Sequence, residues 1–200
     1  TRSAFTSTFH QKESLKTVTD HNDNSLKKRL VSLRNAAIEE YRTDFHPQRL
    51  LKTLCRNVDK ILIDAWNETG LSSEHVLIAV GGYGRGELYP YSDIDVLILL
   101  NRNPDSDLQQ KLESLIQTFW SLGLTIGHSV RTIDECLEES AHDITIQTSL
   151  LEARYITGSR RLFRQMKERY DAQMNAQAFF IAKMLETRQR HVKMGDTPYS

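Results

Sequence analysis

The feature that most constrains this chain is a glycine-rich segment between two short apolar runs. Four glycines occur among residues 81–86, where the backbone can take conformations closed to other residues and its amide groups can approach an anion closely. The run before it, Val76–Val80, and the run after it, Ile94–Leu100, have the length and composition of buried strands. Asp93 and Asp95 open the second run. We therefore expect a strand, a glycine turn and a second strand that begins with two carboxylates.

Two other phosphate-binding motifs share this glycine content. A P-loop requires Lys and then Ser or Thr after its last glycine, but Gly86 is followed by Glu87 and Leu88. A dinucleotide-binding fingerprint requires a third glycine and a crossover helix. Here Glu87 stands at that position, and the next strand begins too soon for such a helix. Both motifs are excluded, which leaves the glycines in combination with the aspartate pair.

The aspartate pair has the chemistry of a metal site. On a strand, Asp93 and Asp95 would point to the same face with their Cα atoms roughly 6.6 Å apart. Two such carboxylates repel each other unless cations neutralise them, and their hard oxygen atoms suit Mg²⁺. Two metal ions can then hold the attacking and leaving oxygens of a phosphoryl displacement, and Arg85 adds a guanidinium that can donate bidentately to a triphosphate. A D-x-D motif alone would be an ordinary strand end. With the glycines and Arg85 it predicts metal-dependent nucleotidyl transfer.

The rest of the chain predicts helices around this core, and the fold class is α/β (α+β) with a small mixed sheet flanked by N-terminal and C-terminal helices. We expect four regions: a flexible N-terminal arm over 1–24, a helical pair over 25–70, the nucleotidyltransferase core over 71–158, and a C-terminal helical segment over 159–200 that starts a further region. Within the core we expect the glycines 81–86 as a loop, a helix over 108–122, a strand over 124–131, a helix over 134–152 and a short strand over 154–157.

The composition limits the classes of partner that we expect for this chain. Lys+Arg and Asp+Glu are both 26, so the formal net charge is zero and no overall field attracts nucleic acid or a membrane. No stretch approaches the ~20 apolar residues of a membrane span, and the polar start lacks the apolar centre of a signal peptide. Cys55 and Cys136 are isolated in the sequence, which is typical of buried free thiols in a reducing compartment. We expect a cytoplasmic protein without nucleic-acid or membrane partners.

The stretch from Gly81 to Leu99, GGYGRGELYPYSDIDVLIL, resembles the DNA polymerase β-like nucleotidyltransferase superfamily. It resembles more closely still the bifunctional uridylyltransferase/uridylyl-removing enzymes that act on the nitrogen-regulatory PII protein, and residues 127–132, 148–154 and 190–199 are also similar to the N-terminal region of those enzymes. The resemblance implies transfer of UMP from UTP to a tyrosine hydroxyl of PII, with release of pyrophosphate.

The same resemblance implies roles for individual residues. Asp93 and Asp95 would hold Mg²⁺, the backbone of Gly81 and Gly82 would bind the triphosphate, and Arg85 would assist. Ser92 either caps the turn or contacts a phosphate, and the cap is favoured.

The chain departs from the family in two respects. The superfamily usually has a third carboxylate on a neighbouring strand, but the strand expected over 124–131 has none and carries His128. This histidine is either a base or phosphate contact, or a hydrogen-bonded structural residue. Glu152 and Asp143 are the remaining carboxylates nearby, and both fit a helix surface better.

The second departure is length, because the family's enzymes also have a hydrolase domain that removes UMP and domains that sense glutamine. The dipeptide His142-Asp143 resembles a hydrolase signature but lacks the other ligands, so we interpret it as a coincidence. Two alternatives stay open: a nucleotidyltransferase with another nucleotide or acceptor, and a catalytically silent domain that senses nucleotide or binds a partner.

Overall fold

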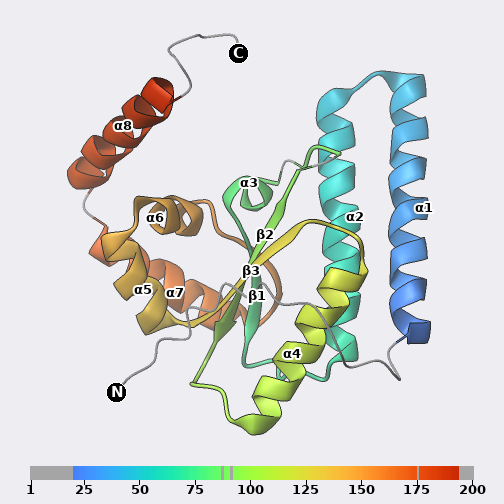
Figure 1. Ribbon diagram of the computed structural model, residues 1–200, viewed down its shortest axis with the longest axis horizontal. Helices are drawn as coiled ribbons and strands as arrows, with labels where there is room; N and C mark the ends of the chain where they lie inside the picture. Colours follow the sequence, from blue (N-terminus) through green and yellow to red (C-terminus); the bar gives the residue numbers. More distant parts are fainter. Residues whose placement is uncertain (1–19, 87, 91, 175, 194–200) are drawn as a thin grey trace.

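The computed structural model describes residues 20–86, 88–90, 92–174 and 176–193, and these form a four-stranded sheet with helices on both faces (Figure 1). One face is covered by α1 (Asp20–Asp44), α2 (Pro47–Glu68) and α4 (Ser106–Ser121). The other is covered by α5 (Ile133–His142), α6 (Ile144–Leu151) and α7 (Arg160–Gln173), and α8 (Ala176–Lys193) contacts α6. The predicted α/β class, with a small mixed sheet between helices, is confirmed.

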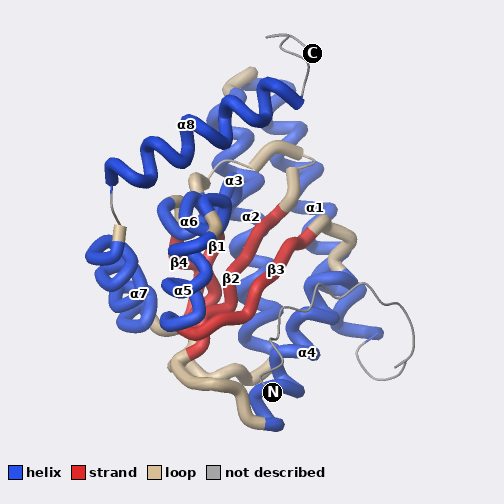
Figure 2. Tube along the Cα trace, turned by 60° about the vertical axis from the view of Figure 1, so that its left-hand side comes forward, coloured by secondary structure: helices blue, strands red, loops and turns tan. Residues whose placement is uncertain are grey.

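The topology of the sheet brings three strand ends together. The strands are β1 (Val76–Val80), β2 (Ile94–Leu100), β3 (Ile126–Thr132) and β4 (Arg154–Gly158), in the order β3-β2-β1-β4. β1 is antiparallel to β2 and β4, whereas β2 and β3 are parallel. The end of β1 therefore meets the beginnings of β2 and β3, as Figure 2 shows. The register pairs Val80 with Asp95 and Asp95 with Gly127, so the residues predicted to form the site lie at this end of the strands.

Apart from Asp95, the two central strands are apolar because helices cover both of their faces. In β1, Leu77 and Ala79 pack toward α1, α2 and α4, while Val76, Ile78 and Val80 pack toward α5, α6 and α7. Burying a side chain of this size contributes roughly 1.5–3 kcal/mol. A strand covered on one face only would have alternated apolar and polar residues, so the continuous apolar runs fit a sheet with helices on both faces.

Local side chains set several helix boundaries. The Asp105 carboxylate accepts a hydrogen bond from the Leu108 amide at 2.9 Å at the start of α4, and the Ser159 hydroxyl accepts one from the Leu162 amide at 3.2 Å at the start of α7. At the start of α5, Thr132 and Glu135 form a capping box. Each cap satisfies an amide that has no partner within its helix.

The structure corrects two of the predicted elements. The single helix expected over 134–152 is two helices, because Asp143 is extended and its carboxylate accepts from the Thr145 amide at 2.7 Å, which starts α6 anew. The glycine segment, expected as a loop, begins with a short helix, α3 (Gly81–Gly84). The helix α1 begins at Asp20, within the region expected to be a flexible arm, and residues 1–19 lie outside the described residues. The division of the chain at 24, 70 and 158 stays a prediction.

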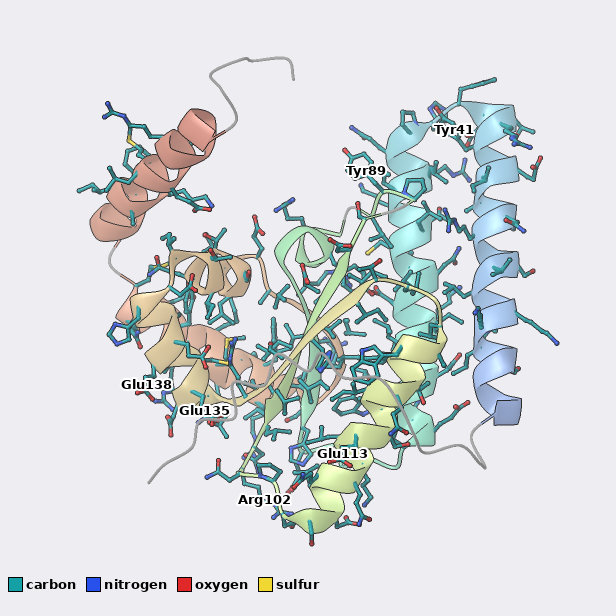
Figure 3. All side chains as sticks on the ribbon, in the orientation of Figure 1. Tyr41, Tyr89, Arg102, Glu113, Glu135 and Glu138 are labelled. Atoms are coloured by element: carbon teal, nitrogen blue, oxygen red, sulfur yellow. The ribbon has the colours of Figure 1, made fainter. Side chains whose placement is uncertain are left out.

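Charged side chains lie on the outer surface. Arg102, Glu113, Glu135 and Glu138 are all exposed, and Figure 3 shows them pointing away from the sheet. Within the described part of the chain, no helix is both long enough and apolar enough to span a lipid bilayer.

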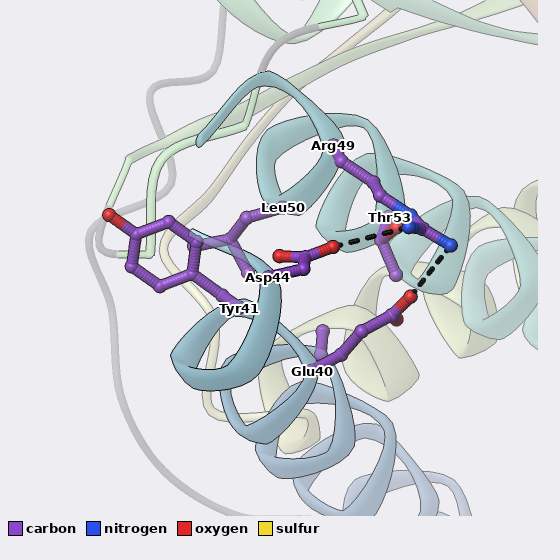
Figure 4. Close-up of a pocket in the computed structure, with 7 residues that line it drawn as sticks. Glu40, Tyr41, Asp44, Arg49, Leu50 and Thr53 are labelled. Carbon is purple, nitrogen blue, oxygen red and sulfur yellow. Dashed lines mark hydrogen bonds and ion pairs between the residues drawn. The ribbon is translucent and has the colours of Figure 1, made fainter. Parts of the chain in front are cut away.

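A shallow depression lies at the turn between α1 and α2 (Figure 4). Arg49 pairs there with Glu40 at 3.0 Å and with Asp44 at 3.2 Å. These ion pairs are largely exposed, and such pairs contribute about 0–1 kcal/mol each. None of the elements that carry the predicted site lines this depression, so we interpret it as part of the helical hairpin only.

Candidate active site

The glycine segment makes a tight turn from β1 into α3. Gly81 has a φ of +56°, which lies in the left-handed region that glycine adopts without a steric penalty. The Arg85 amide donates to the Gly81 carbonyl at 3.3 Å, and the Gly86 amide donates to the Tyr83 carbonyl at 3.1 Å. The first amides of a helix have no carbonyl partner within the helix. The amides at the start of α3 are therefore suited to bind an anion.

The Asp95 carboxylate stands between two glycines at the beginning of β2. A Cβ atom built on Gly81 would lie 3.6 Å from its Oδ2 atom, while one built on Gly127 would lie well inside 3.0 Å of its Oδ1 atom. The carboxylate thus occupies the space that a side chain at position 127 would need. The predicted neighbourhood of glycine segment and aspartate is present in the structure.

The electrostatics of Asp95 are those of a site that needs a cation. Partial burial raises the pKa of the Asp95 carboxyl, and the negative charge of the nearby Asp93 raises it further. Asp93 immediately precedes β2 and is exposed. A divalent cation fits these two hard oxygen donors and would relieve their repulsion.

The third carboxylate expected of the superfamily is not supplied by β3. Gly127 pairs with Asp95 and Ser129 pairs with Leu97 in the parallel register, so a glycine and a serine stand where that carboxylate would be sought. Among the described residues, no group of three or more His, Cys, Asp or Glu side chains is arranged to hold a metal ion. Substrate oxygens and water would have to complete the coordination of a cation at Asp93 and Asp95.

Arg85 lies at the rim of the same edge and is paired. Its guanidinium donates to the Glu152 carboxylate at 2.7 Å, with 55% of the Arg85 side chain exposed and 23% of Glu152. Glu152 follows α6, and its backbone carbonyl lies so close to Gly84 that a Cβ there would overlap it. The sequence indicated a helix surface for Glu152, but the structure places its carboxylate against the glycine segment.

A half-buried polar network connects α3 to α2 and β4, and no pattern in the sequence indicated it. The Tyr83 hydroxyl donates to Asp59 on α2 at 2.5 Å, and Arg154 on β4 donates to the same carboxylate at 2.8 and 3.1 Å. The Arg154 guanidinium also lies 5.1 Å from the centroid of the Tyr83 ring. Burial and the adjacent Asp59 charge raise the pKa of the Tyr83 hydroxyl well above its usual value. The network fixes α3 to elements 24 and 71 residues away along the chain.

The His128 side chain lies on the other face of the sheet from Asp95, although both residues border one hollow, and Ser92 lies in the turn before β2. His128 pairs in register with Val96, whose side chain faces the opposite layer of helices, and the His128 ring packs edge-on against Trp120 of α4 with centroids 6.0 Å apart. Burial lowers the pKa of this imidazole. Ser92 is exposed in a turn in which its amide donates to the Tyr89 carbonyl at 3.1 Å. Alternation along the strands puts the His128 side chain on the other face from Asp95, and a catalytic role for His128 stays a prediction.

The comparisons with known proteins agree with this geometry. Residues 59–148 match the nucleotidyltransferase domain family, so fold and site together define a nucleotidyltransferase. Domains of this class generally use divalent metal ions. More particularly, the chain is homologous to the bifunctional uridylyltransferase/uridylyl-removing enzymes. It is 49% identical to that of Cupriavidus pinatubonensis over 84% of this chain, 55% identical to that of Cupriavidus metallidurans over 76%, and 50% identical to that of Burkholderia mallei over 82%. The resemblance stated from residues 81–99 is confirmed.

The matched segment is a small part of each relative. It spans 19% of the Cupriavidus pinatubonensis enzyme, 18% of the Cupriavidus metallidurans enzyme and 19% of the Burkholderia mallei enzyme. Homology thus supports nucleotidyl transfer by this region. For this chain, any further activity of the full-length relatives is a proposal.

Proposed function

We propose that this chain transfers UMP from UTP to a tyrosine hydroxyl of the PII protein, with Mg²⁺ as its cofactor. The observation that carries the proposal is the position of Asp95 beside the glycine segment, fixed by the pairing of Val80 with Asp95 and of Asp95 with Gly127. The nucleotide is suggested by the relatives, whose names describe uridylyl transfer. The PII acceptor follows from the sequence resemblance.

In the proposed reaction, the chain's own residues bind and orient the nucleotide. The amides of Gly81 and Gly82 and the Arg85 guanidinium contact the triphosphate, and Asp93 and Asp95 hold the cation. When bound, the cation neutralises charge on the phosphate oxygens. The tyrosine oxygen forms a bond to the α-phosphorus as the bond from that phosphorus to the bridging oxygen breaks. Pyrophosphate leaves with the electron pair, and the hydroxyl proton passes to solvent.

Arg85 must exchange partners in this scheme. The Glu152 carboxylate holds it at 2.7 Å, and a triphosphate oxygen would replace that carboxylate as the acceptor. Because more than half of the Arg85 side chain is exposed, water screens the existing pair, and the exchange costs little.

The test is labelling of PII by radioactive UTP with and without Mg²⁺. We expect labelling that EDTA abolishes and that Asp93→Asn or Asp95→Asn reduces by at least a hundredfold with folding intact. Asp107→Asn is the matched control, because Asp107 pairs with Lys111 on the outer face of α4. Labelling by ATP but not by UTP would contradict the proposed nucleotide, and absence of labelling by any nucleotide would contradict the proposed acceptor.

A catalytically silent nucleotide sensor is the second candidate, because β3 offers Gly127 and Ser129 in place of a third carboxylate. Tight UTP binding without any release of pyrophosphate in the presence of PII would support this alternative and exclude transfer.

We also propose that the protein acts in the cytoplasm. Cys55 and Cys136 are both free and buried, as expected for thiols in a reducing compartment.

A further inference from the structure

A hollow of about 340 Å³ adjoins Asp95 on the face of the sheet that α6 covers. Its floor includes Gly127 and Ser129 of β3, and its opposite wall includes Thr145 and Ser149 of α6. Figure 2 shows α5 and α6 in front of the sheet. Binding sites for small groups are typically about 300–1,000 Å³, so this hollow has room for one side chain of moderate size.

Asp95 separates this hollow from the glycine segment. Its Oδ2 atom faces Gly81 and its Oδ1 atom faces Gly127, and Gly127 belongs to the hollow. In a phosphoryl displacement the attacking and leaving oxygens lie roughly in line on opposite sides of the phosphorus. If the amides of Gly81 and Gly82 hold the leaving pyrophosphate, the attacking oxygen must arrive from the Gly127 side.

The lining of the hollow suits a neutral side chain with a hydroxyl group. Leu97, Ile146 and Leu150 supply apolar surface, and Ser129, Thr145 and Ser149 supply hydroxyls. Asp95 and His128 also border the hollow, and the guanidinium of its lining residue Arg131 is already paired with Glu139 at 2.5 Å. A phosphate group would find this charge neutralised, whereas a phenol ring with one polar end matches both kinds of surface.

We propose that this hollow is the acceptor subsite, which receives a hydroxyl-bearing aromatic side chain of the protein substrate beside Asp95. The inference rests on the proposed function for the side from which the acceptor approaches, and it assigns Ser129, Thr145 and Ser149 to acceptor binding. The nucleotide is held on the other side of Asp95, by α3 and Arg85.

The proposal is tested by filling the hollow. Thr145 is exposed in the first turn of α6, so Thr145→Phe adds a ring at the mouth without disturbing the core, and Ser149→Phe adds one deeper inside. Ser73→Phe is the matched control, because Ser73 is exposed in the segment before β1, at the end of that strand away from Gly81. Thermal unfolding establishes that each variant is folded.

For both filling variants we expect the KM for PII to rise at least tenfold, while the Kd for UTP with Mg²⁺, measured by calorimetry, stays within twofold of the original protein. The control should change neither constant. A tenfold loss of UTP affinity in either folded filling variant would assign the hollow to the nucleotide and overturn the proposal. Unchanged KM values in both folded variants would overturn it as well.

A second readout separates this proposal from the proposed function. Adding N-acetyl-tyrosinamide as the probe should shift the methyl resonances of Ile146 and Leu150 in the original protein and not in Thr145→Phe. If PII is not labelled but these shifts appear, the proposed function fails and the subsite stands. If PII is labelled and the methyl groups do not respond, the subsite is wrong and the function stands.

Discussion

Replacing Gly127 with alanine tests the central geometric claim, that the Asp95 carboxylate is positioned by the absence of a side chain opposite it. The new Cβ atom would stand inside 3.0 Å of Oδ1, whereas ordinary contact begins at 3.4 Å. The carboxylate must therefore move by at least about 0.4 Å. Since a misplacement of about 1 Å in an active site can cost ~100-fold in rate, we expect kcat/KM for UMP transfer to fall between tenfold and a hundredfold. Tenfold corresponds to about 1.4 kcal/mol of lost transition-state stabilisation.

The assay is the initial rate of PII labelling by UTP at saturating Mg²⁺, together with the melting temperature of each variant. Gly127 is not among the glycines with positive φ, so alanine there is tolerated by the backbone and the melting temperature should change little. Gly158→Ala is the contrasting control: Gly158 has a φ of +97° and its Cβ would overlap the His75 carbonyl. This variant should lose stability but retain kcat/KM well below its melting temperature. A Gly127→Ala protein with normal kcat/KM and normal stability would refute the reasoning.

Three further predictions follow from the same contacts. Burial and the Asp93 charge raise the pKa of Asp95, so the folded protein binds a proton on this carboxyl more tightly than the unfolded chain does and is destabilised above the raised pKa. In EDTA at pH 7, Asp95→Asn should therefore have a higher melting temperature than the original protein. This difference in melting temperature should vanish as the pH falls through the raised pKa. A constant difference between pH 7 and pH 4 would contradict this. Asp59→Ala leaves Arg154 without its carboxylate, so urea denaturation should show a loss of about 2–4 kcal/mol, toward the lower end for a partly exposed pair; a loss below 0.5 kcal/mol would show that the network does not hold α3. Glu152→Gln removes the carboxylate that competes for Arg85, so the KM for UTP should fall by up to about fivefold, the equivalent of a surface ion pair; a rise in KM would instead mean that Glu152 orients Arg85 for the nucleotide.

Much of the fold could be predicted because local patterns of apolar residues indicate the strands and helices. The apolar runs of β1 and β2 indicated strands covered on both faces, and apolar spacing indicated α1, α2 and α4. The break at Asp143 was missed because a continuous helical pattern does not reveal a capping side chain in its middle. The short helix at Gly81–Gly84 was missed for a related reason, since four glycines predict a turn more strongly than a helix.

The site residues also divide into those that the sequence indicated and those that only the structure brings together. The sequence alone established a glycine segment followed by Asp93 and Asp95, because the spacing of these residues is meaningful along a single strand-turn-strand unit. The sequence could not show which face His128 would take, since that depends on the register of β3 against β2. It also could not show that Asp59, Tyr83 and Arg154 meet, or that Glu152 faces Arg85, because these residues come from elements that are distant along the chain.

The glycine segment and its aspartates were therefore determined by the sequence, since the chemistry depends on residues close together in the chain. The surroundings of Asp95 were decided by the tertiary structure alone. Pairing of Asp95 with Gly127 puts a glycine where a third carboxylate was expected, and it leaves the adjoining hollow beneath α6 in which we place the acceptor. The physical reason is that strand register and helix packing join residues far apart in the chain, and no local pattern specifies them.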